Sequence, residues 1–133
     1  MRRSFIVPFD MAINAMLIIL SCVVLFHLFV FFQLLPYNIV GGGRLHNVSE
    51  MKGFEGAAIL ANAFLLFVIA LRGHYIHLPV PARVITIVLW LFVVIFALNT
   101  VGNFFATTWT EIIIFTPLTI ISTLLCYRLA RGR

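Results

Sequence analysis

Residues 11–35 read MAINAMLIILSCVVLFHLFVFFQLL, an apolar run without a single Asp, Glu, Lys or Arg. As an α-helix this run would be about 37 Å long, which is enough to cross the roughly 30 Å hydrocarbon core of a bilayer with some tilt. Asp10 can cap its start, and Pro36 helps to end it. Although Arg2 and Arg3 precede it, the run is longer than the apolar core of a signal peptide. We interpret it as a first membrane span that is not cleaved.

Three further apolar segments follow the first one. They cover about 54–71, 84–106 and 111–127, and the last contains Pro117. The connections between the segments are polar or rich in Gly and Pro, and Gly41-Gly42-Gly43-Arg44 lies in the longest of them. The chain is too short for four spans and a second globular domain. The sequence therefore predicts an all-α fold, a four-helix antiparallel transmembrane bundle that forms one domain over residues 1–133.

Composition supports this class. Hydrophobic residues make up 63% of the chain and charged residues 10%, whereas soluble domains carry about 25% charged residues. The net charge of +5 does not indicate nucleic-acid binding, because the basic residues lie at the ends of apolar segments and form no stripe. Cys22 and Cys126 are too far apart in sequence for a paired-cysteine motif. We expect no cofactor and no metal, and the expected partners are the lipid bilayer and either a second copy or another membrane protein.

The basic residues predict the orientation. One side of the predicted membrane holds seven of them and the other side holds Arg44 and Lys52. The seven are Arg2, Arg3, Arg72, Arg83, Arg128, Arg131 and Arg133. Because Lys and Arg are in excess on the cytoplasmic side of membrane proteins, we expect both termini and the 73–83 connection in the cytoplasm. The protein would then be a multi-pass protein of the cell inner (plasma) membrane.

Four stretches of the chain carry a resemblance. They are Leu35–Leu45 (LPYNIVGGGRL), Phe54-Glu55, Leu98–Asn103 (LNTVGN) and Phe115–Thr119 (FTPLT). Together they resemble a family of small four-helix bacterial integral membrane proteins of unknown function. The resemblance implies the four-span topology and a bacterial source. It implies no activity.

Polar side chains within the spans are the candidate site, because such residues are rare in membrane helices and usually face the bundle interior. The candidates are His27, Arg44, Glu55, Asn62, Asn99, Asn103 and Glu111. By helical rise, His27, Asn62 and Asn99 lie at a similar depth in the outer half of the predicted bundle. We name no catalytic residue, since no nucleophile–base pair is evident.

Each candidate keeps a structural and a functional interpretation. Asn99, Gly102, Asn103 and Ala106 share one predicted helix face, which favours close helix packing or, alternatively, a ligand or ion site. His27 is either a hydrogen-bonded core residue or a proton or ligand site.

The two acidic candidates lie near predicted helix starts. Glu55 falls in the first turn of its predicted span, where the helix dipole favours an anion, and it shares a face with Asn62. Pairing of Glu55 with Arg44, Lys52 or a ligand is the alternative. Glu111 follows Thr108 at the spacing of a capping box. We also expect the glycine run to let Arg44 fold back onto Glu55 or Glu111.

Three function classes remain open. The first is a non-enzymatic accessory or helix-interaction protein. The second is a small-molecule binding or transport protein, with a polar cavity that opens to the outer side. The third, an enzyme, is the least favoured. A cavity in the outer half would favour the second class, and a packed core there would favour the first.

Overall fold

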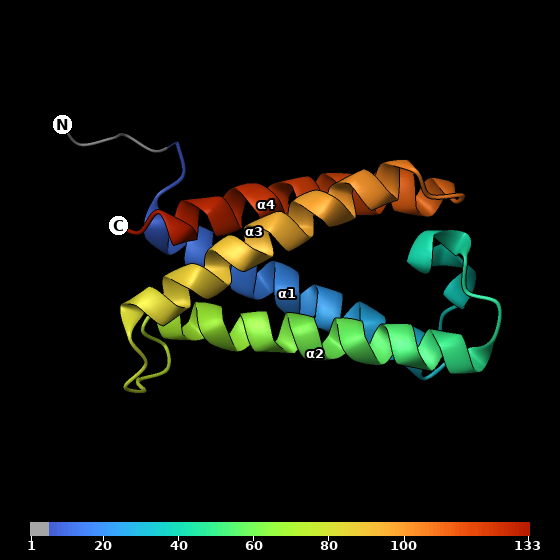
Figure 1. Ribbon diagram of the computed structural model, residues 1–133, viewed down its shortest axis with the longest axis horizontal. Coiled ribbons are helices and arrows are strands. Elements are labelled where there is room, and N and C mark those ends of the chain that lie inside the picture. Colours follow the sequence, from blue (N-terminus) through green and yellow to red (C-terminus); the bar gives the residue numbers. More distant parts are fainter. Residues whose placement is uncertain (1–5) are drawn as a thin grey trace.

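Helices make up most of the chain (Figure 1). The computed structural model describes residues 6–133, so Arg2 and Arg3 of the charge count lie outside the described residues. The long helices are α1 (Phe9–Phe31), α2 (Val48–Arg72), α3 (Ala82–Phe104) and α4 (Thr116–Ala130). The short ones are the 3₁₀ turns η1 (Tyr37–Ile39) and η2 (Gly41–Gly43) and the π-helical turn η3 (Glu111–Phe115), which leads into α4. Within residues 6–133 there is no strand, and the predicted all-α, four-helix fold is confirmed.

The helices form two antiparallel pairs, α1 with α2 and α3 with α4. The pairs pack on each other at one end of the molecule and diverge toward the other (Figure 1). We call the first end the terminal end, since it holds residue 6, the 73–81 connection and Arg133. We call the second the loop end, since it holds the 32–47 connection and the 105–110 turn. At the loop end, η1 and η2 lie between the diverging pairs.

The core follows this arrangement and consists of two apolar clusters. The larger one joins all four helices, and its fully buried members include Met16 of α1, Leu65 and Ile69 of α2, Leu89 of α3 and Leu129 of α4. The smaller one lies at the loop end and joins Val30 of α1, Val40 of the loop and Met51 of α2. A four-helix core therefore holds the terminal end together, while the loop end has a smaller core of α1, α2 and the loop, with Phe115 of η3 packed against it.

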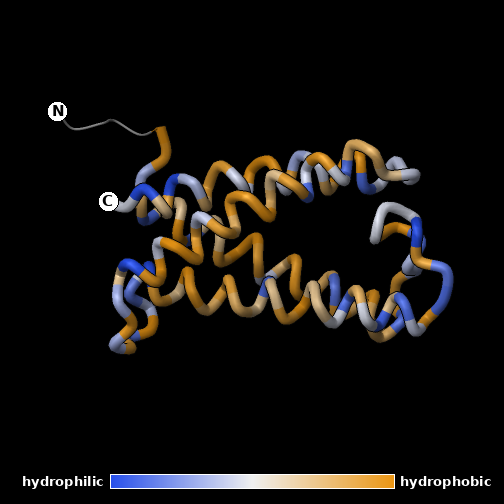
Figure 2. The backbone as a smooth tube through the Cα atoms, in the orientation of Figure 1, coloured by the Kyte–Doolittle hydropathy of each residue, from blue (hydrophilic) through white to orange (hydrophobic). Residues whose placement is uncertain are grey.

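By length and composition, α1, α2, α3 and the continuous helix Glu111–Ala130, which joins η3 to α4, are each long and apolar enough to cross a membrane. Large apolar side chains also point away from the core, as Leu60 (73% exposed) and Leu98 (66% exposed) show. Hydrophobic residues cover the helices, while hydrophilic residues gather toward the two ends (Figure 2). Helices that are apolar on every side are typical of membrane spans.

The predicted start of the second span at residue 54 is wrong by six residues, because α2 begins at Val48. The side chain of Asn47 accepts a hydrogen bond from the backbone N–H of Glu50 at 2.8 Å. The Glu50 carboxylate in turn accepts one from the backbone N–H of His46 at 2.9 Å. This reciprocal cap satisfies donors that a helix start leaves open. Glu55 therefore lies about two turns inside α2 and not in its first turn.

The ends of α1 and α2 also differ from the prediction. The first helix ends at Phe31, four residues before the predicted end at 35, because Gln33 takes a left-handed conformation (φ 61°). Gly73, the residue after α2, has φ −85°, whereas His74 takes the left-handed conformation (φ 61°). Gly73 has a role in packing: a Cβ there would lie 2.6 Å from Cγ2 of Ile13, so its absence lets α1 approach.

The other two helices are shifted only slightly. The third runs over Ala82–Phe104 where 84–106 was predicted, and the fourth continues to Ala130 beyond the predicted 127. Pro117 is the second residue of α4, separated by one residue from the π-helical turn. Because η3 and α4 form one continuous helix, the missing N–H of Pro117 leaves a carbonyl oxygen of the preceding turn without its usual helical partner.

Candidate functional site

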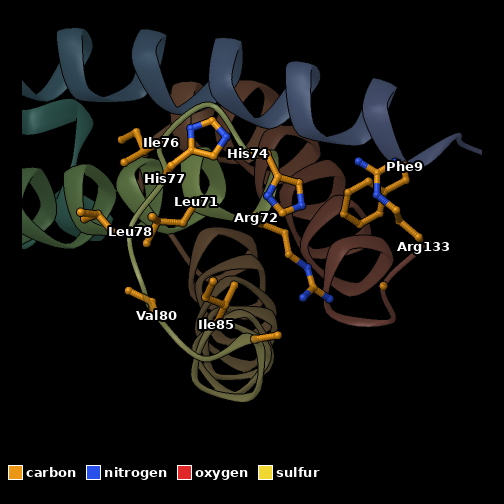
Figure 3. Close-up of a pocket in the computed structure, with 12 residues that line it drawn as sticks. Phe9, Leu71, Arg72, His74, Ile76, His77, Leu78, Val80, Ile85 and Arg133 are labelled. Carbon is orange, nitrogen blue, oxygen red and sulfur yellow. The ribbon is translucent and has the colours of Figure 1, made fainter.

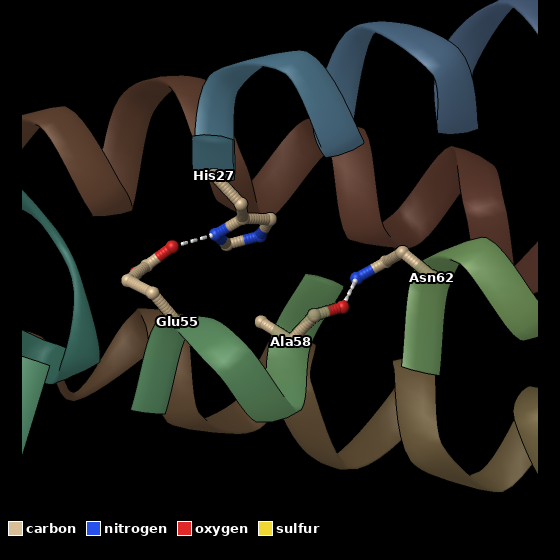
Figure 4. A network of polar contacts seen from close by, with 4 residues as sticks. All are labelled: His27, Glu55, Ala58 and Asn62. Carbon is tan, nitrogen blue, oxygen red and sulfur yellow. Dashed lines mark hydrogen bonds and ion pairs between the residues drawn. The ribbon is translucent and has the colours of Figure 1, made fainter. Parts of the chain in front are cut away.

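His27 of α1 and Glu55 of α2 form a buried pair near the loop end. Nδ1 of His27 is hydrogen-bonded to Oε2 of Glu55, and the two side chains face each other across the helix pair (Figure 4). The Glu55 side chain is completely buried, and the His27 side chain is 16% exposed. The predicted alternatives for Glu55, a terminal charge or a partner among Arg44 and Lys52, are therefore wrong.

The second oxygen of Glu55 is unusual. Among residues 6–133, Oε1 of Glu55 is the one buried side-chain nitrogen or oxygen without a hydrogen-bond partner. An unpaired polar atom in a protein interior costs about 1–3 kcal/mol, and more when the group is charged. A proton at Oε1 would remove the charge of the carboxylate, and a cation there would give this oxygen a partner. The pair is therefore a place where the chain can hold one more positive charge.

Aromatic rings lie beside His27 of the pair. The ring of Phe26 meets that of His27 edge-on at a centroid distance of 5.5 Å, and Phe115 packs on Phe26 at 5.1 Å. The ammonium group of Lys52 lies 5.6 Å from the centroid of the Phe31 ring. The pair therefore lies beside aromatic rings, where electrostatic interactions are stronger than in water.

Asn62 shares the helix face of Glu55 but not its hydrogen bonds. Its Nδ2 donates to the carbonyl oxygen of Ala58, one turn earlier in α2, at 2.8 Å (Figure 4). The seven-residue spacing places Asn62 about 10 Å along the helix from Glu55. Asn62 is half-buried and is the nearest predicted site residue on that face.

The predicted polar stripe on the third span does not lie wholly against another helix: Asn103 faces α4, whereas Asn99 is exposed. Nδ2 of Asn103 lies 3.5 Å from Oγ1 of Thr119 on α4, and Thr100 donates to the same oxygen at 2.9 Å. Asn99 is exposed, and a Cβ at Gly102 would meet nothing within 4 Å. The helix–helix interpretation fits Asn103, but the close approach predicted at Gly102 is wrong for the single chain.

Glu111 is buried and has partners for both oxygens. Oε1 accepts the backbone N–H of Gly42 at 2.7 Å, and Oε2 accepts the hydroxyl of Thr108 at 2.7 Å. Oγ1 of Thr108 also accepts the backbone N–H of Glu111 at 3.5 Å. The predicted capping pair is present, although Glu111 bonds the Thr108 hydroxyl in place of its backbone N–H.

The glycine run is held on both sides. The carbonyl oxygen of Gly42 accepts hydrogen bonds from the backbone N–H of Thr107 at 3.3 Å and from its hydroxyl at 2.9 Å. Gly41, Gly42 and Gly43 all have positive φ, between 63° and 73°. Consecutive left-handed residues require glycine, which was the signal in the sequence for this contact.

Arg44 does not bind either acidic residue. Its side chain is exposed, whereas Glu55 pairs with His27, and Glu111 bonds Gly42 and Thr108. The predicted contact of Arg44 is therefore wrong, although the loop does reach Glu111. It does so through the backbone of Gly42, which needs no long side chain.

The seven candidates thus fall into separate places and do not line one cavity. His27 and Glu55 form the buried pair, Glu111 binds the loop, Asn103 joins α3 to α4, and Asn62, Asn99 and Arg44 stand apart from these contacts. In the described part of the chain, no group of three or more His, Cys, Asp or Glu residues could hold a metal ion.

Comparison with protein-family models, curated proteins and solved structures finds no match to this chain. The predicted resemblance to small bacterial membrane proteins stays a prediction.

Proposed function

We propose that this chain is a multi-pass membrane protein of the binding or transport class, which takes up a proton or a small cation at the His27–Glu55 pair. The observation that carries the proposal is the unpartnered Oε1 of the buried Glu55. Ionisable residues inside membrane spans are costly and commonly mark proton or ion sites. A purely structural helix contact would have no need for a buried oxygen without a partner.

The charge of the pair explains what it could do. When His27 carries protons on both ring nitrogens and Glu55 is ionised, the pair is neutral. A proton that binds Oε1 gives the pair one unit of positive charge, and a small cation at the same atom would do the same. Because the surroundings are apolar, this change in charge alters the electrostatic interaction between α1 and α2. It can thereby change how the two helices pack.

Access would come from the loop end. His27 lies four residues before the last residue of α1, about 6 Å along the helix, and Glu55 lies about 10 Å inside α2. His27 is also the partly exposed member of the pair. The loop end is therefore the shorter route by which a proton or cation would reach the pair.

The orientation belongs to the proposal. Among the described residues, five arginines lie at the terminal end, while Arg44 and Lys52 lie toward the loop end. The five are Arg72, Arg83, Arg128, Arg131 and Arg133. The excess of positive charge supports cytoplasmic termini in an inner membrane. The loop end and the pair would then face the outer side.

Infrared difference spectroscopy of the protein in lipid tests this proposal. A pH step should change the carbonyl band of a protonated carboxylic acid, and Glu55→Gln should abolish that change. Glu111→Gln is the matched control, because Glu111 is the other buried carboxylate and both its oxygens are bonded. If the folded protein shows no carbonyl band that changes with pH and depends on Glu55, the proposal is wrong.

A second candidate function rests on Asn99. This amide is exposed on an apolar helix, and the next turn carries Gly102 with open space around it. Amides and small residues are the groups that join helices within membranes. An accessory protein that pairs with a second copy or another membrane protein would use this face. Native mass spectrometry of the wild type and of Asn99→Leu tests it, since the variant should lose any dimer that the wild type forms.

A further inference from the structure

The terminal end of the molecule contains a cleft of about 450 Å³, far from the His27–Glu55 pair (Figure 3). Every helix end nearby contributes to it. Phe9 comes from α1, Arg72 from α2, His74 and His77 from the connection that follows, and Arg133 from the segment after α4. The volume lies within the range of small-molecule sites.

Positive charge is concentrated on one side of this cleft. Arg72 and Arg133 line it, and their guanidinium carbons lie 5.9 and 4.5 Å from the centroid of the Phe9 ring. The guanidinium carbon of Arg128 lies 5.5 Å from the same centroid, although Arg128 does not line the cleft. An aromatic face attracts such cations and helps to hold them together. Like charges around one ring nevertheless repel each other, which favours an anion beside the two that line the cleft, Arg72 and Arg133.

Acidic side chains do not offset this charge. The chain has four acidic residues, and Glu50, Glu55 and Glu111 all lie toward the loop end. Asp10 is the acidic residue at the terminal end, where Oδ1 lies 3.1 Å from Nη2 of Arg133. Its side chain is 77% exposed, so this pair contributes little against the charge of the cleft.

Arg72 is fixed in a position that leaves donors for a ligand. Its Nε and Nη2 both donate to the carbonyl oxygen of Leu129, at 3.1 and 2.9 Å. These bonds account for two of the five N–H donors of a guanidinium. The guanidinium of Arg72 is therefore held in one position at the cleft, and its planar arrangement of N–H donors suits phosphate oxygens.

The opposite side of the cleft is apolar. Leu78 and Val80 of the connection and Ile85 of α3 line it (Figure 3). In a membrane-crossing bundle, this end of the helices lies where hydrocarbon gives way to head groups. The cleft thus offers cationic donors beside an apolar wall, at the depth of a lipid phosphate.

We propose that this cleft binds a phosphate group, carried either by an anionic phospholipid or by a small soluble phosphate ester. Basic pockets between membrane helices are a known means of holding phosphorylated head groups. Arg72 and Arg133 supply charge-assisted hydrogen bonds to the phosphate oxygens, and the apolar wall takes the adjoining carbon chain. His74 and His77, with rings stacked at 6.5 Å, border the cleft and can donate further hydrogen bonds.

The full-length protein in neutral detergent provides the test. Thermal stability and apparent affinity are measured with mixed micelles that contain phosphatidylglycerol, with phosphatidylcholine micelles, and with glycerol 3-phosphate in solution. Arg133→Gln should weaken binding of the phosphorylated probe about tenfold, the cost of one charge-assisted hydrogen bond. Arg72→Gln should do the same, and Arg133→Gln remains informative if Arg72→Gln fails to fold.

Arg131→Gln is the matched control. Arg131 lies at the same end, over the ring of Tyr127 at 6.0 Å, and does not line the cleft. Binding of phosphatidylglycerol alone would identify a lipid site, and binding of glycerol 3-phosphate as well would identify a site for the phosphate group itself. If neither probe binds better than phosphatidylcholine, or if Arg131→Gln weakens binding as much as Arg133→Gln, the cleft is not a phosphate site.

Discussion

The backbone N–H of Gly42 lies 2.7 Å from Oε1 of Glu111, although the two residues are 69 positions apart in the chain. This bond joins the loop after α1 to η3, the turn that leads into α4. On the other side of the loop, Val40 packs with Val30 and Met51. The loop therefore connects the two helix pairs where they diverge, by a polar contact on one side and an apolar contact on the other.

Gly43→Ala should open this connection. A Cβ at residue 43 would lie 2.0 Å from Oγ1 of Thr107, and the φ of +73° disfavours any side chain. The left-handed conformation alone costs about 1–2 kcal/mol. Gly53→Ala is the control, because nothing lies within 4 Å of a Cβ there and alanine favours the helix. Thermal unfolding in detergent should show a lower midpoint for Gly43→Ala only, and equal midpoints would contradict the packing of the loop.

Glu111→Ala should destabilise the protein, whereas Arg44→Ala should leave its unfolding unchanged. The first change removes the acceptor of both Gly42 and Thr108, and an unsatisfied buried group costs about 1–3 kcal/mol. The second removes an exposed side chain. Denaturation of both variants in the same detergent measures the difference. A loss of stability in Arg44→Ala would support the predicted contact between Arg44 and an acidic residue.

Glu111 and Arg44 show which parts of the structure could be predicted from the sequence. Charge and apolar runs predicted four helices and an outer loop that folds back over the bundle. Arg44 was expected to make the contact, because its length and charge can be read from the sequence. The backbone N–H of Gly42 makes it instead, and a backbone donor has no signature apart from the glycines that position it.

The buried pair was missed for a similar reason. Asn47-Val48-Ser49-Glu50 holds the cap that starts α2, but hydropathy placed the start at Phe54. Because the predicted helix started six residues too late, Glu55 was placed in its first turn. A partner on α1 was therefore not considered for Glu55. His27 and Glu55 come from different helices, so their contact depends on how α1 and α2 pack. A single sequence does not contain that information.

His27→Leu and Glu55→Met, separately and together, should show strong coupling. Breaking a buried pair leaves an uncompensated group and costs about 3–5 kcal/mol, whereas two apolar residues can pack without that loss. The double variant should therefore be more stable than the two single losses predict, with a coupling of roughly 0.5–3 kcal/mol. Additive losses in thermal unfolding would mean that the pair contributes nothing as a pair.

Cysteine labelling should report the orientation. In a background where Cys22 and Cys126 are replaced by alanine, a cysteine at Asn38 should react with a membrane-impermeant reagent in intact cells. A cysteine at Leu78 should react only after the cells are opened, since the positive charge of that end favours the cytoplasm. Both positions are exposed. The reverse labelling pattern would invert the proposed topology.

Gly73→Leu and Gly102→Leu should differ strongly, although both replace a glycine at or within a helix. At Gly73, a Cβ would lie 2.6 Å from Cγ2 of the buried Ile13, and overpacking of a core costs about 1–3 kcal/mol. At Gly102, nothing lies within 4 Å, and leucine is the better helix former by up to about 1 kcal/mol. Thermal unfolding in detergent that keeps the protein monomeric should therefore show a loss for Gly73→Leu and none for Gly102→Leu. Equal losses would mean that another surface covers Gly102, and native mass spectrometry of the two variants would then show whether that surface is a second copy of the chain.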